Sequence, residues 1–356
     1  MSEFQVITAA EQVATHLRNE LARGAWVGVL PGSNRLAELL GVGHGTIDTA
    51  LGILEKDGLI VPQGVGRRRR IVSGGKQNTP SLQIKILLYE KSDGSSHYIV
   101  DLFHRLHEAG HQAAFTEKSL LDMKMDTSRI KRHVKNTTAD AWIVFGGSRS
   151  VLEWFAKRPE PVFALAGRRR SVEIAGCGPD KVMAQTAILK KLVGFGHRRI
   201  VILSREEHRV PRPGHFEQSF LEQMAAHGLP VGQYNLPNWS NDPGGLQDCL
   251  DSLFATTPPT AMFIEEMPIF VAASQHLAQR GISAPRNISM VCGDPNPAFD
   301  WCRPTVAHIK WDPRLLVRRI VKWVNNVAQG KQDLSQNSIR SVFVDGGTIG
   351  PAPRDS

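Results

Sequence analysis

Two groups of polar residues near the amino terminus could contact a polyanion. Four consecutive arginines, Arg67, Arg68, Arg69 and Arg70, follow a glycine-bearing turn at 63–66. Guanidinium groups suit phosphate contacts or an A·T-rich minor groove. Four short polar residues on the exposed face of a predicted helix could reach base edges or phosphates: His44, Thr46, Asp48 and Thr49. A charge run alone more often marks a solvated strand, so the meaning of both groups depends on the elements that carry them.

A second set of candidates lies where apolar segments end. Asp294 follows a strand predicted at 289–292, at the edge where parallel sheets bind ligands. Tyr98, Phe299 and Trp301 lie in loops where a ligand cleft is expected, and their rings could stack on a sugar. A simple packing role is an equal alternative for each aromatic residue.

Other conspicuous residues have simpler interpretations. His197-Arg198-Arg199 looks catalytic in isolation, but it opens a predicted strand after a helix that ends in glycine, so we expect a structural role. Arg168-Arg169-Arg170 is interpreted as a solvated turn rather than a second nucleic-acid site. Gly146-Gly147-Ser148 is a lone strand-to-helix turn. The chain contains none of the phosphate-loop, nucleophile-elbow or dinucleotide motifs, which argues against an enzyme.

Composition limits the remaining possibilities. The 356 residues are 41% hydrophobic and 22% charged, which indicates two or three globular units. The apolar runs are shorter than a membrane span, and the amino terminus has no secretory pattern, so we expect a cytoplasmic protein. The net charge of +9 makes contact with a polyanion easy. The widely spaced cysteines predict buried thiols without a disulfide or zinc site: Cys177, Cys249, Cys292 and Cys302.

Residues 1–73 begin with two predicted helices. Apolar residues recur every four positions from Val13 to Leu21, which places one buried stripe on a helix that ends at Gly24. A second helix follows Pro31-Gly32, with Ser33 as its N-cap. Its buried residues are predicted to be Leu36, Leu39 and Leu40.

A third helix and a hairpin complete this amino-terminal module. The helix runs from about Gly45 to Lys56, and strands at 59–61 and 67–72 follow it. Its inward face is predicted to be Ile47, Ala50, Leu51 and Leu54. The small polar residues at 74–82 have the composition of a linker. Three helices and a hairpin in this order are typical of a winged helix-turn-helix, whose third helix enters the major groove.

After residue 82 the pattern alternates between apolar strands and helices. Such alternation predicts parallel sheets covered by helices on both faces, an α/β fold with enough length for two lobes. The expected strands are 84–89, 141–145, 162–165, 200–203, 261–264 and 289–292. The expected helices are 97–109, 182–194, 216–227, 246–254, 269–279 and 315–329.

Residues 13–72 resemble the winged helix of GntR-type transcription regulators. The segment 30–42, LPGSNRLAELLGV, is similar to the family's P-S-x-x-x-L-A-x-x-L-G-V core, and 51–60, LGILEKDGLI, is similar to its L-x-x-L-E-x-x-G-L-I ending. We therefore add Ser33 and Arg35 to the candidate DNA-binding residues. The recognition helix departs from the family, because 43–48 reads GHGTID and lacks two expected arginines. Residues 1–73 hold eight basic and seven acidic residues, so affinity depends on placement.

The rest of the chain resembles the effector domain of LacI/GalR repressors, which is built like a periplasmic sugar-binding protein. Similar segments are 192–203 (LVGFGHRRIVIL), 259–263 (PTAMF), 281–294 (GISAPRNISMVCGD), 303–306 (RPTV) and 346–351 (GGTIGP). The resemblance implies a fold of two lobes, residues 83–356, with a winged helix-turn-helix at 1–73 in front of it.

The same resemblance implies effector-binding residues. Arg212-Pro213-Gly214-His215-Phe216 is similar to the family's R-x-x-G-F, whose arginine reaches ligand hydroxyls, although His215 replaces the glycine. Glu265 and Glu266 replace an Asn-Asp pair, and one of them is expected to accept sugar hydroxyl protons. Asp180 is interpreted first as a helix N-cap. The candidate effector-binding set is Tyr98, Arg212, Phe216, Glu265, Glu266, Asp294 and Trp301.

The leading hypothesis is a transcription regulator, expected to be a repressor, controlled by a small sugar-like effector. Its partners would be double-stranded operator DNA, the effector and, because palindromic operators demand two-fold symmetry, a second copy of the chain. No cofactor or metal is expected. The alternative is a sugar-binding or sugar-processing α/β enzyme. A transport-associated binding protein fits less well, because the secretion signal is missing and a DNA reader is predicted in front.

Overall fold

The described part of this computed structural model comprises residues 8–22, 26, 28–64, 67–72 and 80–353. The chain divides into two compact units, one formed by residues 1–81 with 106–112 and the other by the remainder. We call residues 8–72 the head and residues 80–353 the body, and each is described by itself. Most of the predicted linker at 74–82 and the predicted helix end at Gly24 lie outside the described residues.

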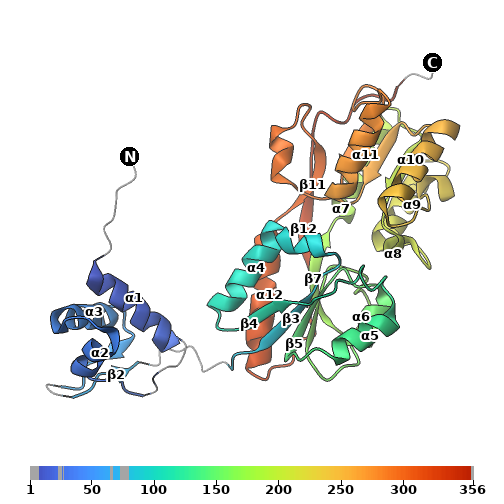
Figure 1. The fold of residues 1–356 in the computed structure, drawn as a ribbon. Coiled ribbons are helices and arrows are strands. Elements are labelled where there is room, and N and C mark those ends of the chain that lie inside the picture. Colours follow the sequence, from blue (N-terminus) through green and yellow to red (C-terminus); the bar gives the residue numbers. More distant parts are fainter. Residues whose placement is uncertain (1–7, 23–25, 27, 65–66, 73–79, 354–356) are drawn as a thin grey trace. The chain divides into compact units, whose positions relative to one another are not determined.

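Three helices and a short antiparallel strand pair form the head (Figure 1). They are α1 (Ala9–Ala22), α2 (Ser33–Leu40), α3 (His44–Lys56), β1 (Ile60–Val61) and β2 (Arg70–Ile71). Leu17 of α1, Leu36 of α2 and Leu51 of α3 are fully buried in one apolar cluster. The inward face predicted for α3 is confirmed, because Ile47, Ala50, Leu51 and Leu54 are all buried. The expected element order is therefore observed.

Three details of the head differ from the prediction. Ser33 is the first residue of α2, and Gly32 is its N-cap without a side-chain hydrogen bond. Leu39 is 56% exposed, because the short α2 turns Leu36 and Ala37 inward instead. The paired strands are only two residues long, and β2 also pairs with the Val29 segment through a bridge to Arg70.

The body alternates strands and helices along the chain. Its first half contains β3 (Gln83–Leu87), η1 (Lys91–Ser95), α4 (His97–Glu108), β4 (Gln112–Phe115), α5 (Thr127–Lys135), β5 (Ala141–Phe145), α6 (Arg149–Phe155), β6 (Val162–Leu165) and β7 (Ala175–Asp180). The chain continues with α7 (Val182–Gly194), β8 (Ile200–Leu203), α8 (Glu206–Arg209), α9 (His215–Ala226), η2 (Gln233–Asn235) and α10 (Pro243–Thr256). It ends with β9 (Ala261–Ile264), α11 (Met267–Gln279), β10 (Ser289–Cys292), η3 (Pro297–Trp301), β11 (Ala307–Trp311), α12 (Pro313–Ala328) and β12 (Gln336–Val344).

One long strand joins the two lobes of the body. The sheet order is β4-β3-β5-β6-β7-β12-β11-β10-β9-β8. Residues 336–340 of β12 pair in parallel with β7 of the first lobe, and residues 341–344 pair antiparallel with β11 of the second. The neighbouring strands from β3 through β5 and β6 to β7, and from β8 through β9 and β10 to β11, pair in parallel. The curled, mostly parallel sheet therefore belongs to an α/β fold with two lobes, as predicted.

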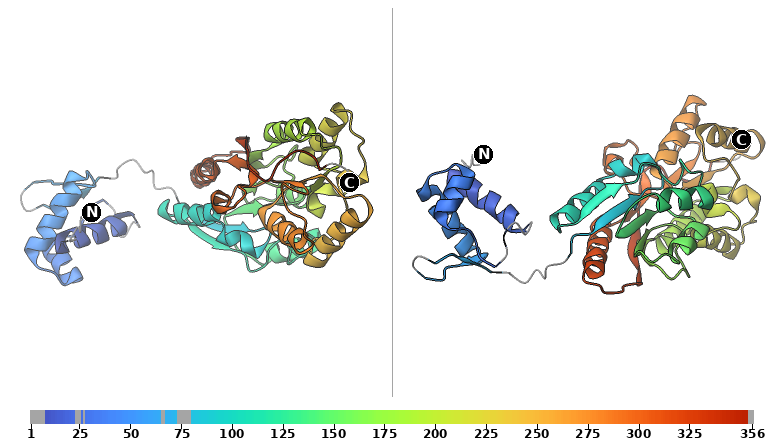
Figure 2. Two further views of the ribbon diagram at one scale, coloured as in Figure 1. Left: turned by 90° about the horizontal axis from the view of Figure 1, so that it is seen from above. Right: turned by 60° about the horizontal axis from the view of Figure 1, so that its bottom comes forward.

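Helices cover both faces of each lobe's sheet (Figure 2). In the second lobe Ile202 and Phe263 face one apolar cluster with α7 and α9, whereas Leu203 and Ile264 face another with α10 and α11. Successive strand residues point to opposite faces, so a strand covered on both sides is apolar throughout. This is why the second lobe's strands are continuous apolar runs and were recognisable in the sequence.

The chain crosses back to complete the first lobe. Helix α12 follows β11 of the second lobe, yet its Trp323 packs on Phe163 of β6 with ring centroids 5.3 Å apart. No helix among the described residues is long and apolar enough to cross a bilayer. All four cysteines are free, and Cys302 alone of the four is half-buried rather than buried.

The turn after β6 depends on a glycine. Gly167 has φ of +69°, and a Cβ there would lie 2.6 Å from the Gly147 carbonyl oxygen. Gly330 has a similar φ of +72° but open space around it. Gly330→Ala should therefore lower the free energy of unfolding by about 1–2 kcal/mol, from backbone strain alone. Gly167→Ala should lower the free energy of unfolding by at least about 1 kcal/mol more than Gly330→Ala does, because the turns at Gly147 and Gly167 must move apart.

Urea unfolding of the full chain, followed by circular dichroism, measures both values. Equal losses for the two variants would show that the close approach of the two turns contributes nothing.

Candidate functional site

The polar face of α3 is accessible in the head. His44, Asp48 and Thr49 are exposed, and Thr46 is half-buried. The Thr49 hydroxyl donates a hydrogen bond of 2.8 Å to the Gly45 carbonyl oxygen of its own helix. This face therefore offers an imidazole, a carboxylate and a hydroxyl to a partner, as the sequence predicts, while the Thr49 hydroxyl already has an acceptor.

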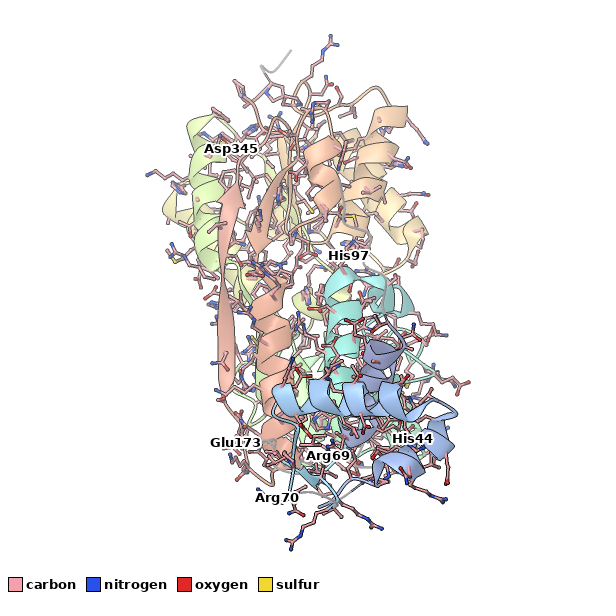
Figure 3. All side chains as sticks on the ribbon, turned by 90° about the vertical axis from the view of Figure 1, so that its left-hand side faces the viewer. His44, Arg69, Arg70, His97, Glu173 and Asp345 are labelled. Atoms are coloured by element: carbon pink, nitrogen blue, oxygen red, sulfur yellow. The ribbon has the colours of Figure 1, made fainter. Side chains whose placement is uncertain are left out.

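The four arginines of the head do not act as one group. Arg67, Arg68 and Arg70 are exposed, but Arg69 donates from Nε to Oε1 of Glu55 on α3 at 2.6 Å. Figure 3 labels Arg69 and Arg70 on the head, together with His44 of α3. The Arg69 guanidinium thus ties its segment to α3, whereas the other three arginines are free of this contact, and a phosphate contact by Arg69 stays a prediction.

The two residues added through the GntR resemblance lie on α2. Arg35 is exposed, and its Nη1 lies 3.5 Å from Glu38 Oε2 in an ion pair whose side chains are both about 70% exposed. Such exposed pairs contribute little free energy, so Arg35 can exchange this partner for another anion. Ser33 is half-buried at the start of the helix.

In the body, charged residues directly follow the carboxyl ends of strands in both lobes. Glu90 comes after β3, Lys181 after β7, Arg205 after β8, and Asp294 after β10. In Figure 3, His97 at the start of α4 marks the level at which the two lobes meet. We call the residues that meet at this level the interlobe cluster: Tyr89, Glu90, Asp93, Tyr98, Arg168, Lys181, Arg205, Glu207, His208, Glu217, Glu265, Glu266 and Asp294.

Arg205 is the central cation of the interlobe cluster. Its Nε and Nη2 lie 3.0 and 2.9 Å from Glu266 Oε2 of the second lobe. Its Nη2 also lies 3.6 Å from Glu90 Oε2 of the first lobe, and its guanidinium is 5.4 Å from the centre of the Tyr89 ring. Burial alone would lower the pKa of Arg205, but Glu266, Tyr89 and Glu90 outweigh it and raise the pKa. The residue stays charged and bridges the lobes.

A second ion pair joins the residue between β7 and α7 to the loop after β10. Lys181 Nζ donates to Asp294 Oδ1 at 2.7 Å, and the lysine side chain is only 13% exposed. Burial opposes the charge on Lys181, yet Asp294 and Glu265 raise its pKa overall. Burial raises the pKa of Tyr98, and the nearby Asp294 carboxylate adds to this effect. Burial also raises the pKa of Asp93 to about 7.

His208 lies between two carboxylates of the second lobe. Its Nδ1 is 2.8 Å from Glu265 Oε2 and 3.7 Å from Glu217 Oε1. Burial would lower the pKa of His208, but Glu265 and then Glu217 reverse the direction and raise it. Burial would raise the pKa of Glu265, but His208 lowers it overall, whereas burial and Glu265 raise the pKa of Glu217. His208 and Glu265 are therefore an ion pair.

Hydrogen bonds also link the lobes around these pairs. The Tyr89 hydroxyl of the first lobe donates to Glu207 Oε2 at 3.1 Å. Arg168, after β6, donates to the main-chain carbonyl oxygens of Glu207, Val210 and Arg212 at 3.1, 2.9 and 2.8 Å. The segment 205–214 of the second lobe is thus held by side chains of the first.

Four of the predicted effector-binding residues come together here. Tyr98 lies close enough to Asp294 and Glu266 for their charges to raise its pKa, and Glu265 lies near Lys181, the partner of Asp294. Glu265 and Glu266 follow β9, Asp294 follows β10, and Tyr98 lies in the first turn of α4, so the rule that parallel strands gather ligands at their carboxyl edge holds for the three acidic residues.

The other three candidates have different surroundings. Arg212 has an exposed side chain, and its carbonyl oxygen accepts a hydrogen bond from Arg168. The Phe216 ring is 5.6 Å from Phe263 and packs against the second lobe's apolar cluster. Trp301 is 87% exposed, while Phe299 is buried against Phe270 and His308. Phe216 and Phe299 therefore pack against other side chains, whereas the Trp301 side chain is open to solvent.

Several simpler interpretations can also be compared with the structure. His197 is fully buried, and its Nε2 lies 2.9 Å from the Gly350 carbonyl oxygen, which confirms a structural role. Asp180 is the last residue of β7 and Lys181 is the N-cap, although Asp180 Oδ1 does accept from the Val182 N–H at 3.2 Å. The solvated turn predicted at 168–170 is wrong for Arg168 and Arg169, which are half-buried and hydrogen-bonded.

The sequence reasoning missed the basic members of the cluster. Lys181, Arg205 and His208 were not singled out, although each lies within five residues of the carboxyl end of a strand. A signal was available, since Ser204-Arg205 directly follows the strand predicted at 200–203. Charged residues at that edge have to be paired when the lobes cover them, so acidic candidates there imply basic partners.

The comparisons with known proteins concern mainly the body. Residues 189–348 match the family model of the periplasmic binding protein-like domain. No curated protein matches the chain. Many solved structures are similar to the chain, and the three described below share only 14–15% sequence identity with it.

Three of these structures illustrate the similarity. The complex of the transcriptional regulator CelR with cellobiose has a TM-score of 0.61 and 14% identity, covering 90% of this chain and 100% of that one. A LacI family transcriptional regulator from Enterococcus faecium with bound ribose has a TM-score of 0.60 and 14% identity, covering 76% and 100%. The lac repressor dimer bound to operator and the anti-inducer ONPF has a TM-score of 0.60 and 15% identity, covering 78% and 96%.

Identities of this size establish a shared fold. Together with the match over residues 189–348 and the strand β12 that serves both lobes, they show that the body of this chain has the two-lobed fold of a periplasmic binding protein-like domain.

Proposed function

We propose that this protein is a DNA-binding transcriptional regulator, a repressor, whose body binds a small sugar-like effector. The proposal rests on the presence of two parts in one chain. The head has an exposed polar helix face and exposed arginines, and the body has the periplasmic binding protein-like fold. In this proposal residues 1–73 are the DNA-binding domain, 74–82 a linker and 83–356 the effector domain.

The head would bind DNA as a GntR-type winged helix-turn-helix. Helix α3 would enter the major groove and offer His44, Thr46 and Asp48 to base edges. Arg67, Arg68 and Arg70 would contact phosphates or the minor groove beside it. The exposure of these side chains supports this assignment, and the Arg69–Glu55 ion pair would hold the arginine segment against α3.

The interlobe cluster is the proposed effector site. Glu265, Glu266 and Asp294 supply carboxylate oxygens that can accept hydrogen bonds from hydroxyl groups, and Tyr98 supplies a ring and a hydroxyl. The exposed guanidinium of Arg212 could donate to the same ligand, because its segment is held beside the first lobe by Arg168. Two structurally similar regulators contain ribose or cellobiose, which supports a sugar-like effector here.

Effector binding would act through the contacts between the lobes. Tyr89, Glu90 and Arg168 of the first lobe already contact the 205–214 segment of the second, so a ligand that exchanges with these groups changes how the lobes close. In a homodimer such a change would alter the spacing of two heads on a palindromic operator. A coupling free energy of about 1–3 kcal/mol would change operator occupancy by about 5- to 150-fold.

The DNA-binding part of the proposal predicts a charge effect confined to the head. Arg68→Ala and Arg70→Ala should each weaken binding to promoter DNA of the protein's own operon, and to DNA of other sequences, by a similar factor. Each should also reduce the slope of log affinity against log salt concentration by about one. Fluorescence anisotropy over a range of salt concentrations measures both quantities.

Lys331→Ala is the matched control, since it removes an exposed charge from the body. If Lys331→Ala and the two arginine variants weaken binding equally, net charge rather than the arginine segment governs the interaction. Failure of the unmodified protein to bind any promoter fragment would refute the DNA-binding proposal.

The effector part predicts a ligand-dependent rise in thermal stability. A sugar at 100 times its Kd should stabilise the native body by about 2.7 kcal/mol and raise its Tm by about 5–10 °C. Arg212→Ala should abolish the shift, because the variant loses a donor to the ligand. A differential scanning fluorimetry screen of mono- and disaccharides on the full chain provides the measurement.

Arg286→Ala is the control for this experiment, since Arg286 is another exposed arginine of the second lobe. An unchanged shift in Arg212→Ala would remove Arg212 from the site. An additional Asp294→Asn variant that also keeps the full shift would move the effector away from the interlobe cluster altogether.

A further inference from the structure

Three potential metal ligands converge inside the second lobe. His208 comes from α8, Glu217 from the first turn of α9, and Glu265 from the end of β9. One donor atom from each, the imidazole Nδ1 and two carboxylate oxygens, lies within 4.8 Å of the others. Three separate segments therefore bring nitrogen and oxygen donors to a single point.

The spacing of these atoms suits a small divalent ion. A tetrahedral zinc ion with bonds of 2.0–2.1 Å separates its ligands by about 3.3 Å. The distances from His208 Nδ1 are 2.8 Å to Glu265 Oε2 and 3.7 Å to Glu217 Oε1, which bracket that value. The third separation, between the two carboxylate oxygens, is no more than 4.8 Å, so side-chain movements would have to draw the two carboxylates together to complete the geometry, with a fourth position left for water or another ligand.

Two buried oxygens at this point have no hydrogen-bond partner. Glu217 is only 2% exposed, and its Oε1, the atom that faces His208, makes no hydrogen bond. The Ser204 hydroxyl is fully buried beside the carboxylates of Glu217 and Glu265, and its Oγ makes no hydrogen bond of ordinary geometry either. Buried polar oxygens are rarely left unsatisfied, and a bound cation would satisfy Glu217 directly.

The backbone also fixes the direction of Glu217. A Cβ on Gly214, the N-cap of α9, would lie 2.6 Å from Glu217 Oε2, so only glycine lets this carboxylate fold against the helix start. One oxygen thus lies at the N-terminus of α9 and the other is turned toward His208. Position 214 therefore requires glycine, because a side chain there would collide with the Glu217 carboxylate in this orientation.

Neighbouring cations already have other partners. Lys181 is paired with Asp294, Arg205 with Glu266 and Glu90, and Arg209 donates to the Ser204 carbonyl, Asn238 and the Trp239 carbonyl. Arg168 donates to the three carbonyl oxygens of the 205–214 segment. Among the described basic residues, His208 is the one that lies directly between the two carboxylates, and a divalent ion could take the place of its proton there.

From these observations we propose that His208, Glu217 and Glu265 form a binding site for one divalent transition-metal ion, with Zn²⁺ as the best match to the donor set. Imidazole and carboxylate together suit first-row divalent metals better than Ca²⁺ or Mg²⁺, which prefer oxygen ligands alone. His208 is 26% exposed at its side chain, so an ion can reach the site from that side.

The site would connect the metal to the contacts between the lobes. His208 lies one residue after Glu207, which accepts from Tyr89 of the first lobe, and within the segment held by Arg168. A bound ion would fix this segment to α9 and β9. The proposal goes beyond DNA and sugar binding, and its test uses neither ligand, so the two proposals can fail separately.

The test is a titration of the metal-free full chain, without a polyhistidine tag, with Zn²⁺ against a chromophoric chelator. We expect one ion per chain, and a loss of affinity of at least about tenfold in His208→Ala and in Glu217→Gln. Glu222→Gln and His227→Ala are the matched controls, because both residues are exposed and belong to the same helix or its C-cap. Circular dichroism establishes that each variant is folded.

A second measurement does not depend on the buried Glu217 variant. Co²⁺ added to the unmodified chain should give visible absorption bands of a four- or five-coordinate ion, and His208→Ala should lose them. The proposal is overturned if the unmodified chain binds no Zn²⁺ or Co²⁺ in a one-to-one complex. It is equally overturned if His208→Ala keeps the affinity and the Co²⁺ bands of the unmodified chain.

Discussion

Pairing of buried charge at the facing carboxyl ends of two parallel sheets is the constraint on which the body depends. An ion removed from water costs several kcal/mol unless an opposite charge and hydrogen bonds compensate it. Arg205 with Glu266 and Glu90, and Lys181 with Asp294, meet this requirement. Arg205 is paired with Glu266 inside the second lobe, and Glu90 of the first lobe adds a second carboxylate only when the lobes are together.

The same constraint limits how a ligand can enter the interlobe cluster. The polar groups that could bind a ligand are already engaged with one another: Glu266 with Arg205, Glu265 with His208, and Asp294 with Lys181. A ligand must therefore replace existing hydrogen bonds with equally good ones, since a buried group left without a partner costs about 1–3 kcal/mol. Small differences in the polar groups of two ligands would then change their affinities strongly, and the charged cluster would be selective among ligands for this reason.

The fold was predictable where burial on both faces determined the sequence. The strands expected at 141–145, 162–165, 200–203, 261–264 and 289–292 agree with β5, β6, β8, β9 and β10, and the helix expected at 182–194 agrees with α7. Strand β12 was missed because it begins with three polar residues and shows neither a continuous apolar run nor strict alternation, and because it pairs with β7, more than 150 residues earlier in the chain. Strand β7 was missed because it contains two glycines and a proline, which local propensity assigns to a turn.

Within the site, the predictable members were those that follow an apolar strand directly, such as Glu265, Glu266 and Asp294. Arg205 also follows a predicted strand, at 200–203, but its pairing with Glu90 was not predictable from local pattern, because that pair joins two lobes and depends on how they close. Phe216 contacts Phe263 of the second lobe's core, a contact that its motif did not indicate, and its part in effector binding stays a prediction.

The head illustrates how one residue type takes two roles within a single run. Side chains of an extended segment alternate in direction, so neighbours along the chain cannot all point to the same partner. Arg69 turns toward α3 and pairs with Glu55, whereas Arg68 and Arg70 on either side of it are exposed. A run of four arginines therefore supplies one internal anchor as well as external charge. The anchor holds the exposed pair at a fixed place beside α3, which a flexible basic tail of the same composition could not do.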